Sequence, residues 1–348
     1  MDYRNLGMTG VKVSVICLGT MTWGEQNSQD EAFAQMDYAT GQGVNFFDTA
    51  ELYAIPPKAE TYGRTEEVIG NWFEKSGRRK EVILATKVAG PAPHFSWIRG
   101  GQSALTRAQI REAAEGSLKR LKTDYIDLYQ IHWPQRPVNS FGKLGYGEKE
   151  VTGGESDGIL EVLHAAQSLI AEGKVRHIGV SNETPWGVMT YLSHASSITL
   201  PRIVSIQNPY SFLNRSFEVG LAEIALQEQV GLLAYAPLAA GVLSGKYLDG
   251  KIPKGTRWDI DPRGSRYKRP KTDEAVRAYM DVAKKHGLDA TQMAISFVCR
   301  QPFLTSAIIG ATKMDQLASN IAASAVKLSD EVLADINAVH ALIPNPCP

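Results

Sequence analysis

Eight short apolar runs alternate with segments of helical periodicity along the chain, and this alternation restricts the possible folds more than any other feature. Each run is rich in β-branched residues and mostly apolar throughout, which is typical of parallel strands covered on both faces. Between the runs, segments such as 106–122 repeat apolar residues every three or four positions, as amphipathic helices do. The runs are 13–19, 44–48, 82–88, 125–133, 177–181, 203–208, 231–238 and 306–310.

Eight strands, each followed by at least one helix, predict an α/β protein whose residues 1–348 form a single (β/α)8 TIM barrel domain. A typical barrel has about 250 residues, so three further segments account for the surplus. Segment 3–14 predicts an N-terminal β-hairpin that turns at Thr9 and Gly10. Segments 134–157 and 247–272 are long, polar and rich in glycine and proline. Because both follow strands, we expect them to form long loops on the C-terminal face of the barrel.

The alternative topology, a doubly wound sheet, would place a G-x-G-x-x-G turn after the first strand. The turn here reads GTMTWGEQ, with a different glycine spacing. The closest approach to a phosphate-binding loop is AGVLSGKY, in which Ala240 takes the first glycine position and Tyr247 replaces Ser or Thr. Both nucleotide-binding folds are therefore disfavoured.

Composition excludes several classes of function. Lys and Arg balance Asp and Glu at 37 each, so nothing predicts a nucleic-acid or membrane surface. No apolar run approaches 18 residues, and the N-terminus has no signal-peptide core. The three cysteines have neither zinc-like nor redox-like spacing. We expect a cytoplasmic protein with reduced thiols; the sequence leaves its oligomeric state open.

Polar residues stand where several of the predicted strands end. In a barrel these positions converge on one mouth, where active sites lie. Each residue alone has a structural explanation: Asp48 suits a turn cap, and His132 suits a buried core histidine. Their convergence favours function instead. The residues are Asp48, Lys87, His132, Ser181, Asn182, Gln207 and Asn208.

The types of residue at this mouth favour proton transfer. No metal-ligand spacing occurs, so we expect no metal. No second carboxylate pairs with Asp48 as in glycosidases, and no G-x-S-x-G turn supplies a serine nucleophile. The phenol of Tyr53 is a weak acid on its own. A neighbouring ammonium from Lys87 would lower its pKa, Asp48 would hold that lysine, and His132 would bind a carbonyl oxygen. Such a set protonates an oxygen while a hydride reaches the adjoining carbon.

A hydride requires a cofactor, and two segments suit one. Segment 234–247 follows the seventh strand with small residues, together with Tyr235 and Lys246. Tyr235 could stack on a nicotinamide ring, although a tyrosine packed in the core would give the same sequence pattern. Segment 308–320 predicts a strand, a glycine-containing turn and a helix, whose N-terminus suits an anion.

These segments together resemble the aldo-keto reductase superfamily over essentially the whole chain, and within it the bacterial Tas-type reductases. The stretches that carry the resemblance are LGTMTWGEQ, FFDTAELY, ATKV, DLYQIHWP, IGVSN, QNPYSFLNR, AYAPLAAGVLSGKY and IIGATKMDQLASN.

The resemblance implies an NADPH-dependent oxidoreductase that reduces small-molecule aldehydes or ketones to alcohols. It makes Tyr53 the general acid, Lys87 and Asp48 its tuning groups, and His132 the residue that orients the carbonyl. For NADPH or NADP+, it implies contacts from Thr20, Met21, Asp48, Ser181, Asn182, Gln207, Tyr235, Ala236, Pro237, Leu238, Ala239, Lys246, Gly310, Thr312, Gln316 and Asn320.

The choice of NADPH depends on two basic residues. The turn after the eighth strand lacks the basic residue that many family members place there. A branch that resembles potassium-channel β-subunits instead uses a lysine and an arginine after the seventh strand, and Lys246 and Arg257 fit that scheme. The same resemblance leaves an alternative function open, namely an NADP(H)-binding, redox-sensing regulatory protein.

Aromatic residues beside the tetrad are expected to wall the substrate pocket. Trp23 and Trp133 adjoin tetrad strands, so with Tyr53 and His132 they are the expected lining. Further candidates, each of which core packing would explain equally well, are Trp97, Trp186 and Tyr210.

Overall fold

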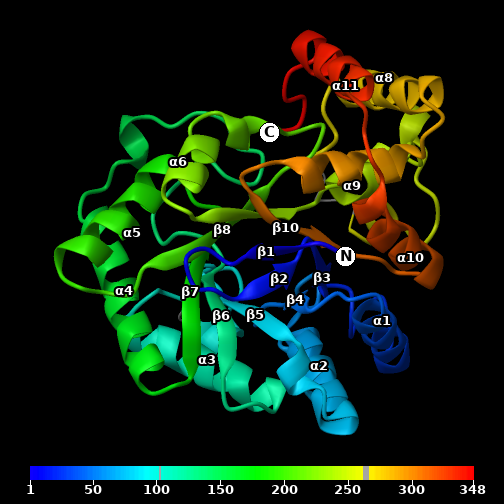
Figure 1. Ribbon diagram of the computed structural model, residues 1–348. Helices are drawn as coiled ribbons and strands as arrows, with labels where there is room; N and C mark the ends of the chain where they lie inside the picture. The colour runs from blue at the N-terminus through cyan, green and yellow to red at the C-terminus, as the bar shows by residue number, and fades with distance from the viewer. Residues whose placement is uncertain (102, 262–265) are drawn as a thin grey trace.

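The computed structural model describes residues 1–101, 103–261 and 266–348, and its centre is a closed barrel of eight parallel strands (Figure 1). The barrel closes where the last strand pairs with the first, and the predicted TIM-barrel fold is confirmed. In order around the barrel, the strands are β3 (Ile16–Gly19), β4 (Phe46–Asp48), β5 (Ile83–Val88), β6 (Ile126–Ile131), β7 (Val175–Ser181), β8 (Ile203–Pro209), β9 (Gly231–Tyr235) and β10 (Leu304–Ile309).

Helices surround the strands (Figure 1). Their starts follow local sequence: Ser28 caps α1, and Glu31 completes the capping box that the sequence predicts. The helices are α1 (Gln29–Gly41), α2 (Arg64–Ser76), α3 (Arg107–Leu121), α4 (Glu155–Ala171), α5 (Pro185–Ser197), α6 (Leu221–Gln227), α7 (Arg257–Ile260), α8 (Thr272–Lys285), α9 (Ala290–Arg300), α10 (Met314–Ala322) and α11 (Asp330–Leu342). Among the described residues, no helix has the length and apolarity needed to cross a bilayer.

The predicted N-terminal hairpin is confirmed and closes one end of the barrel. Strands β1 (Tyr3–Asn5) and β2 (Lys12–Ser14) pair antiparallel and lie across the middle of the barrel in Figure 1. Leu6 and Val13 are fully buried and pack with inward-facing residues of the barrel strands. A Cβ at Gly7 would lie 2.7 Å from the carbonyl oxygen of Val204, so the hairpin approaches closely only with glycine there. The open end, and with it any site, lies at the opposite mouth.

The interior of the barrel changes from apolar to polar along its axis. Phe46, Ala85 and Leu128 face inward in one apolar cluster near the hairpin. Successive inward-facing residues of a strand are two positions apart. The next inward positions on β4, β5 and β6 are therefore Asp48, Lys87 and Gln130. The strand register pairs Lys87 with Gln130 and Asp48 with Ala85, and the Asp48 side chain reaches Lys87 Nζ at 2.6 Å. The strand ends thus supply a polar layer above an apolar one.

Two predicted segments differ in detail from the structure. The first apolar run, 13–19, is divided at Val15 between β2 and β3, because its beginning belongs to the hairpin. The long segment 247–272 contains α7, a single helical turn that begins at Arg257 and that the sequence did not predict. Residues 262–265 of that segment lie outside the described residues.

Candidate active site

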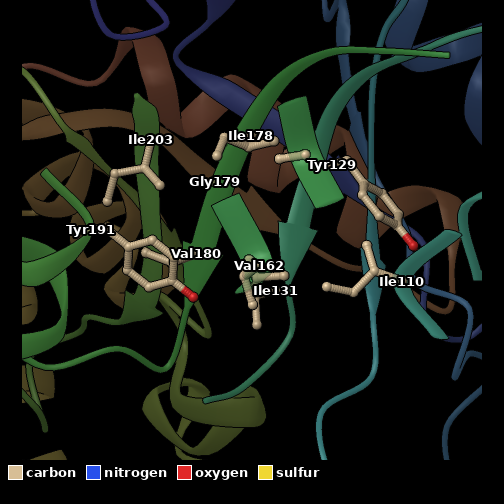
Figure 2. A pocket seen from close by; sticks show the side chains of 10 residues that line it. Ile110, Tyr129, Ile131, Val162, Ile178, Gly179, Val180, Tyr191 and Ile203 are labelled. Carbon is tan, nitrogen blue, oxygen red and sulfur yellow. The ribbon is translucent and has the colours of Figure 1, made fainter. Parts of the chain in front are cut away.

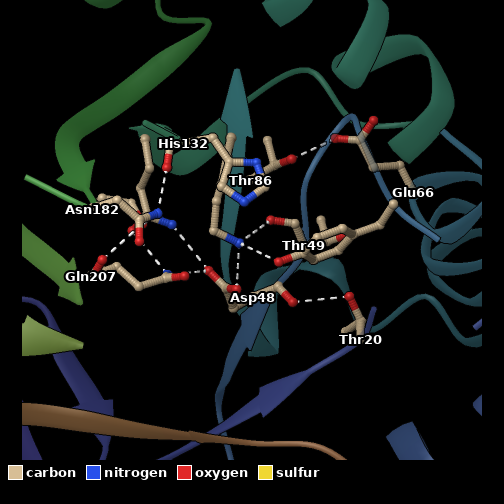
Figure 3. A network of polar contacts seen from close by, with 12 residues as sticks. Thr20, Asp48, Thr49, Glu66, Thr86, His132, Asn182 and Gln207 are labelled. Atoms are coloured by element: carbon tan, nitrogen blue, oxygen red, sulfur yellow. Dashed lines mark hydrogen bonds and ion pairs between the residues drawn. The ribbon is translucent and has the colours of Figure 1, made fainter. Parts of the chain in front are cut away.

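Four side chains meet at the C-terminal mouth of the barrel, and they are the four that the sequence predicted as catalytic. Asp48 ends β4, Lys87 lies near the end of β5, and His132 directly follows β6. Tyr53 comes from the loop between β4 and α2. Figure 3 shows Asp48 at the centre of the polar network that joins these strand ends.

Lys87 is the hub of the group. Its Nζ lies 2.6 Å from Asp48 Oδ2, 2.8 Å from the carbonyl oxygen of Thr49 and 3.4 Å from the Tyr53 hydroxyl. Lys87 and Asp48 are both buried. Burial by itself lowers the pKa of the Lys87 ammonium, but Asp48 and Tyr53 outweigh it, and the pKa is raised. Lys87 is therefore a fixed positive charge beside the phenol.

The second oxygen of Asp48 accepts two amide hydrogen bonds. Gln130 Nε2 lies 3.0 Å and Gln207 Nε2 lies 2.8 Å from Asp48 Oδ1. Gln207 was predicted to contact the cofactor; its amide N–H is directed to Asp48, while its Oε1 accepts no hydrogen bond from a described residue. Sequence reasoning missed Gln130. The signal was present, because Gln130 interrupts an apolar strand two positions before His132 and so shares its face.

The Tyr53 phenol is neutral, which corrects one expectation. The sequence argument was that the Lys87 ammonium lowers the pKa of Tyr53. Burial raises that pKa, and although Lys87 and Arg257 act in the opposite direction, the net shift is upward. Desolvation disfavours the charged phenolate, so Tyr53 holds its proton next to a cation. It is a potential donor rather than a preformed base.

His132 stands next to Tyr53, with the two rings edge to face and their centroids 5.7 Å apart. Burial, and then the charge of Lys87, hold the pKa of His132 well below its ordinary value. The ring is therefore neutral at physiological pH and can donate one hydrogen bond and accept another. Its Nδ1 is buried and has no partner among the described residues. Buried polar atoms are nearly always paired, so this one is open to an additional group.

A chain of hydrogen bonds links the ends of β6, β7, β8 and β9. Asn182 Nδ2 donates to the carbonyl oxygen of His132 at 2.8 Å, and Ser181 Oγ donates to that of Gln207 at 2.8 Å. Asn182 Oδ1 accepts from the Tyr235 hydroxyl at 2.7 Å. The structure brings these predicted cofactor residues together, and each of them already forms a hydrogen bond with another residue.

Left-handed backbone occurs at three predicted cofactor residues and at the neighbouring Ala240. Asn182, Ala236, Ala239 and Ala240 all have φ between 49° and 56°. This conformation is uncommon for residues other than glycine, and such strain clusters at ligand-binding sites. Pro237 and Leu238 lie within the same turn after β9, which precedes the 3-10 helix Ala239–Ser244.

Three cations around the segment after β9 make no ion pair with a described residue. Arg257 Nη1 lies 3.7 Å from Met21 Sδ, and the Lys246 ammonium lies 5.2 Å from the centre of the Tyr247 ring. The third is Arg266, whose Nη1 donates to the Tyr235 hydroxyl at 3.2 Å. Sequence reasoning missed Arg266, because several basic residues follow one another there and nothing distinguishes them. Unpaired cations of this kind suit phosphate groups.

The remaining predicted cofactor residues lie around β3 and β10. Thr20 is buried and its Oγ1 donates to the carbonyl oxygen of Asp48 at 2.9 Å. Asn320 Nδ2 donates to the carbonyl oxygen of Gly310 at 3.3 Å, and Gln316 Oε1 accepts from the backbone N–H of Thr312 at 3.3 Å. The turn after β10 and the start of α10 thus form one connected unit.

The predicted aromatic lining is partly wrong. Trp133 is half-buried beside His132, with their rings 4.9 Å apart, and remains available to a substrate. Trp23 is fully buried in the main core, and its Nε1 donates to Gln35 Oε1 at 3.0 Å. Its loop turns the indole inward, so Trp23 has no surface to offer a ligand. Tyr210 is also a core residue, packed against Phe297 and Phe303.

A small cavity between the barrel wall and helices α3, α4 and α5 is not a second site. Figure 2 shows its lining, which includes Tyr129, Ile178 and Tyr191. Its volume is about 10 Å³, and nearly all its wall is apolar. A buried water needs at least that much room and two or more polar partners. The cavity is a packing defect.

The fold defines a class of protein, the (β/α)8 barrels. The sequence pattern of the Aldo/keto reductase family matches residues 15–341, so the chain belongs to that family. The family generally uses NAD(P)H and acts on small-molecule carbonyl compounds.

Three relatives indicate where in the family the chain lies. It is 52% identical over 348 residues, the full length of both chains, to "Protein tas" of Escherichia coli (strain K12). It is 34% identical over 338 residues, 97% of this chain and 95% of the relative, to the "Uncharacterized oxidoreductase YrpG" of Bacillus subtilis (strain 168). A "Probable voltage-gated potassium channel subunit beta" of Arabidopsis thaliana is 30% identical over 331 residues, 93% of this chain and 91% of the relative. The predicted resemblance is confirmed, and the protein is an oxidoreductase.

Proposed function

We propose that this protein reduces aldehydes or ketones to alcohols with NADPH, and that Tyr53 donates the proton. One observation carries the proposal: a neutral phenol lies 3.4 Å from a buried ammonium, with a neutral imidazole edge-on to it. An acid is useful when it keeps its proton until the reaction needs it and when its conjugate base is then stabilised. Tyr53 and Lys87 meet both conditions.

Each member of the group has a distinct task. His132 offers a ring N–H to the carbonyl oxygen of the substrate and so directs it toward Tyr53. Tyr53 Oη transfers its proton to that oxygen, and the Lys87 ammonium stabilises the phenolate that remains. Asp48 keeps Lys87 charged and in place, while Gln130 and Gln207 hold Asp48. Trp133 walls the pocket beside His132.

The residues present fit a nicotinamide dinucleotide. When bound, it supplies the hydride. Asn182, Ser181 and the free Oε1 of Gln207 would hold the carboxamide, and Tyr235 would stack on the ring. The strained turn 236–239, with Lys246, would border the pyrophosphate. Thr20 and Met21 would lie on the nicotinamide side, and Gly310, Thr312, Gln316 and Asn320 would hold the adenosine half.

The proposed preference for NADPH over NADH rests on the positive charges near the segment after β9. A 2′-phosphate is the only group that distinguishes the two cofactors, and it requires a cation. Arg257 is half-buried, and its burial lowers the pKa of its guanidinium. Asp261 acts on the Arg257 charge through space, but no described carboxylate forms an ion pair with it, so a phosphate beside Arg257 would supply one. Lys246 and Arg266 would reinforce the positive field.

A second candidate function is an NADP(H)-dependent regulator of a partner protein. The relatives from Arabidopsis thaliana and Oryza sativa subsp. japonica, both named as probable potassium-channel β-subunits and both 30% identical, favour it. The complete tetrad argues for the enzyme instead.

Turnover separates the two proposals. We expect the purified full-length protein to consume NADPH, followed by nicotinamide absorbance, when a panel of aliphatic and aromatic aldehydes and ketones is added. Tight NADPH binding with no turnover of any panel member would contradict the reductase and favour the regulator.

A further inference from the structure

A pocket of about 310 Å³ opens on the far side of the loop that carries Tyr53. It lies between that loop, the segment between β5 and α3, and one face of α3. None of its residues belongs to the catalytic group, and only Trp97 was among the further candidates for the substrate lining. That volume is enough for a small organic molecule. The residues that line it are Glu51, Tyr62, Trp97, Arg99, Gly100, Glu112, Ala113, Gly116 and Arg120.

The floor of the pocket is a rigid ion pair. Glu51 and Arg99 form a salt bridge in which both side chains are almost fully withdrawn from solvent. Glu51 also accepts from the backbone N–H of Ala89 at 2.6 Å and from the Tyr62 hydroxyl at 2.9 Å. Arg99 Nε donates to Gln109 Oε1 at 2.9 Å. The pair neutralises itself and fixes the position of the floor.

Arg120 forms a second fixed element of the wall. Its Nε donates to Glu66 Oε2 at 2.7 Å, and Glu66 is held in turn by Thr86, as Figure 3 shows. A Cβ at Gly63 would lie 2.5 Å from Arg120 Cδ, so glycine there makes room for the arginine. Its Nη1 makes no hydrogen bond with a described residue. Arg120 therefore presents an unused donor from a held position.

Two further polar groups of the lining residues, the Trp97 indole N–H and the Glu112 carboxylate, lack a hydrogen-bond acceptor or a counter-charge among the described residues. The Nε1 of Trp97 is buried and has no hydrogen-bond partner among the described residues. On the exposed part of α3, the Glu112 carboxylate receives only a neutral amide N–H from Gln109, at 3.2 Å, and forms no ion pair with a described residue. Two donors on lining residues, Trp97 Nε1 and Arg120 Nη1, and one carboxylate, that of Glu112, thus lack matching partners among the described residues.

We propose that this pocket is a binding site for a small zwitterion that carries a carboxylate and an ammonium group. The carboxylate accepts from Trp97 Nε1 and Arg120 Nη1, and the ammonium lies against Glu112. A simple anion fits less well, because Arg99 and Arg120 are already neutralised by Glu51 and Glu66 while Glu112 adds a negative charge. An apolar ligand would leave the donors and Glu112 unmatched.

Three probes of similar chain length separate the ligand classes. Butyrate has only the carboxylate, butylammonium has only the cation, and γ-aminobutyrate has both. In calorimetric titrations of the full-length protein, we expect γ-aminobutyrate to bind at least about tenfold more tightly than either other probe. Equal binding of butyrate would make this an anion site, and no detectable binding of γ-aminobutyrate would remove the site; either result overturns the proposal.

Two mild variants locate the binding. Trp97→Phe removes the indole donor but keeps an aromatic ring, and Glu112→Gln removes the rim charge. Each should weaken γ-aminobutyrate binding about tenfold, while Glu115→Gln, an exposed glutamate on the same helix outside the pocket, should not. Melting curves identify any variant that fails to fold. Unchanged affinity in both folded variants would contradict the proposed site. These measurements do not depend on whether the protein is a reductase.

Discussion

At the scale of single residues, the site depends on which groups hold protons. Burial keeps Tyr53 neutral and His132 neutral, while Asp48 keeps Lys87 charged. Each of these side chains has the form that the proposed reaction needs before any substrate arrives. The environment of the barrel mouth, rather than the residue types alone, sets these forms.

The low pKa of His132 predicts a pH dependence of stability. In the unfolded chain this histidine binds a proton below about pH 6.5, whereas the folded protein keeps it neutral to lower pH. Protonation therefore favours the unfolded state, and the stabilisation present above pH 6.5 is lost as the pH falls. Relative to His132→Gln, the free energy of unfolding of the wild type should fall by up to about 1.4 kcal/mol for each pH unit below about pH 6.5.

Denaturant unfolding of the wild type and His132→Gln between pH 7 and pH 5 measures this difference. A free-energy gap between the two proteins that stays constant over that range would show that His132 is protonated equally in the folded and unfolded states.

At the scale of elements, we propose that the segment after β9 determines cofactor choice. Arg257 opens α7 and reaches Met21 across the mouth, and Arg266 reaches Tyr235 from the same segment. Arg257 forms no ion pair with a described carboxylate, although Asp261 acts on its charge through space, and we propose that a phosphate takes the paired position.

Removing the Arg257 charge should discriminate between the two cofactors. We expect Arg257→Ala to weaken NADPH binding by about ten- to a hundredfold, as for a lost charged hydrogen bond, and to leave NADH binding almost unchanged. Fluorescence titration with both cofactors measures this. Lys254→Ala, an exposed cation of the same segment, is the control. Equal losses for both cofactors would remove Arg257 from the phosphate site.

The N-terminal hairpin predicts a second effect at this scale, on stability alone. Gly7 and Gly10 both have positive φ, but only at Gly7 would a Cβ collide with backbone, 2.7 Å from the oxygen of Val204. Gly10→Ala should cost about 1 kcal/mol for its conformation, and Gly7→Ala should cost at least 1 kcal/mol more. Urea unfolding of the two variants provides the comparison, and equal losses would show that the hairpin does not press on the barrel.

At the scale of the whole molecule, the sequence predicted the barrel because eight apolar runs admit few other arrangements. The tetrad followed from polar residues at strand ends, since parallel strands share one mouth. The sequence did not identify Gln130 and Glu51 as functional residues, because a single polar residue in a strand or loop has many structural explanations. Trp23 was misplaced because its position beside a tetrad strand does not reveal which way its loop turns. The net pKa shift of Tyr53 required burial, which only the fold supplies.

The barrel ends in a polar layer at its mouth, and we propose that Tyr53 protonates a carbonyl oxygen there. The polar layer exists because β4, β5 and β6 each exchange an apolar inward residue for Asp48, Lys87 or Gln130 at the mouth. The hairpin closes the opposite end, so chemistry is confined to one face.

The most direct test is a single-turnover measurement on Tyr53→Phe loaded with NADPH, mixed rapidly with an aldehyde that the wild type reduces. The account predicts that the variant binds NADPH as tightly as the wild type, because the phenylalanine keeps the ring, and that nicotinamide oxidation slows by about 10²- to 10⁴-fold, as for the loss of a general acid. Oxidation at the wild-type rate would contradict it.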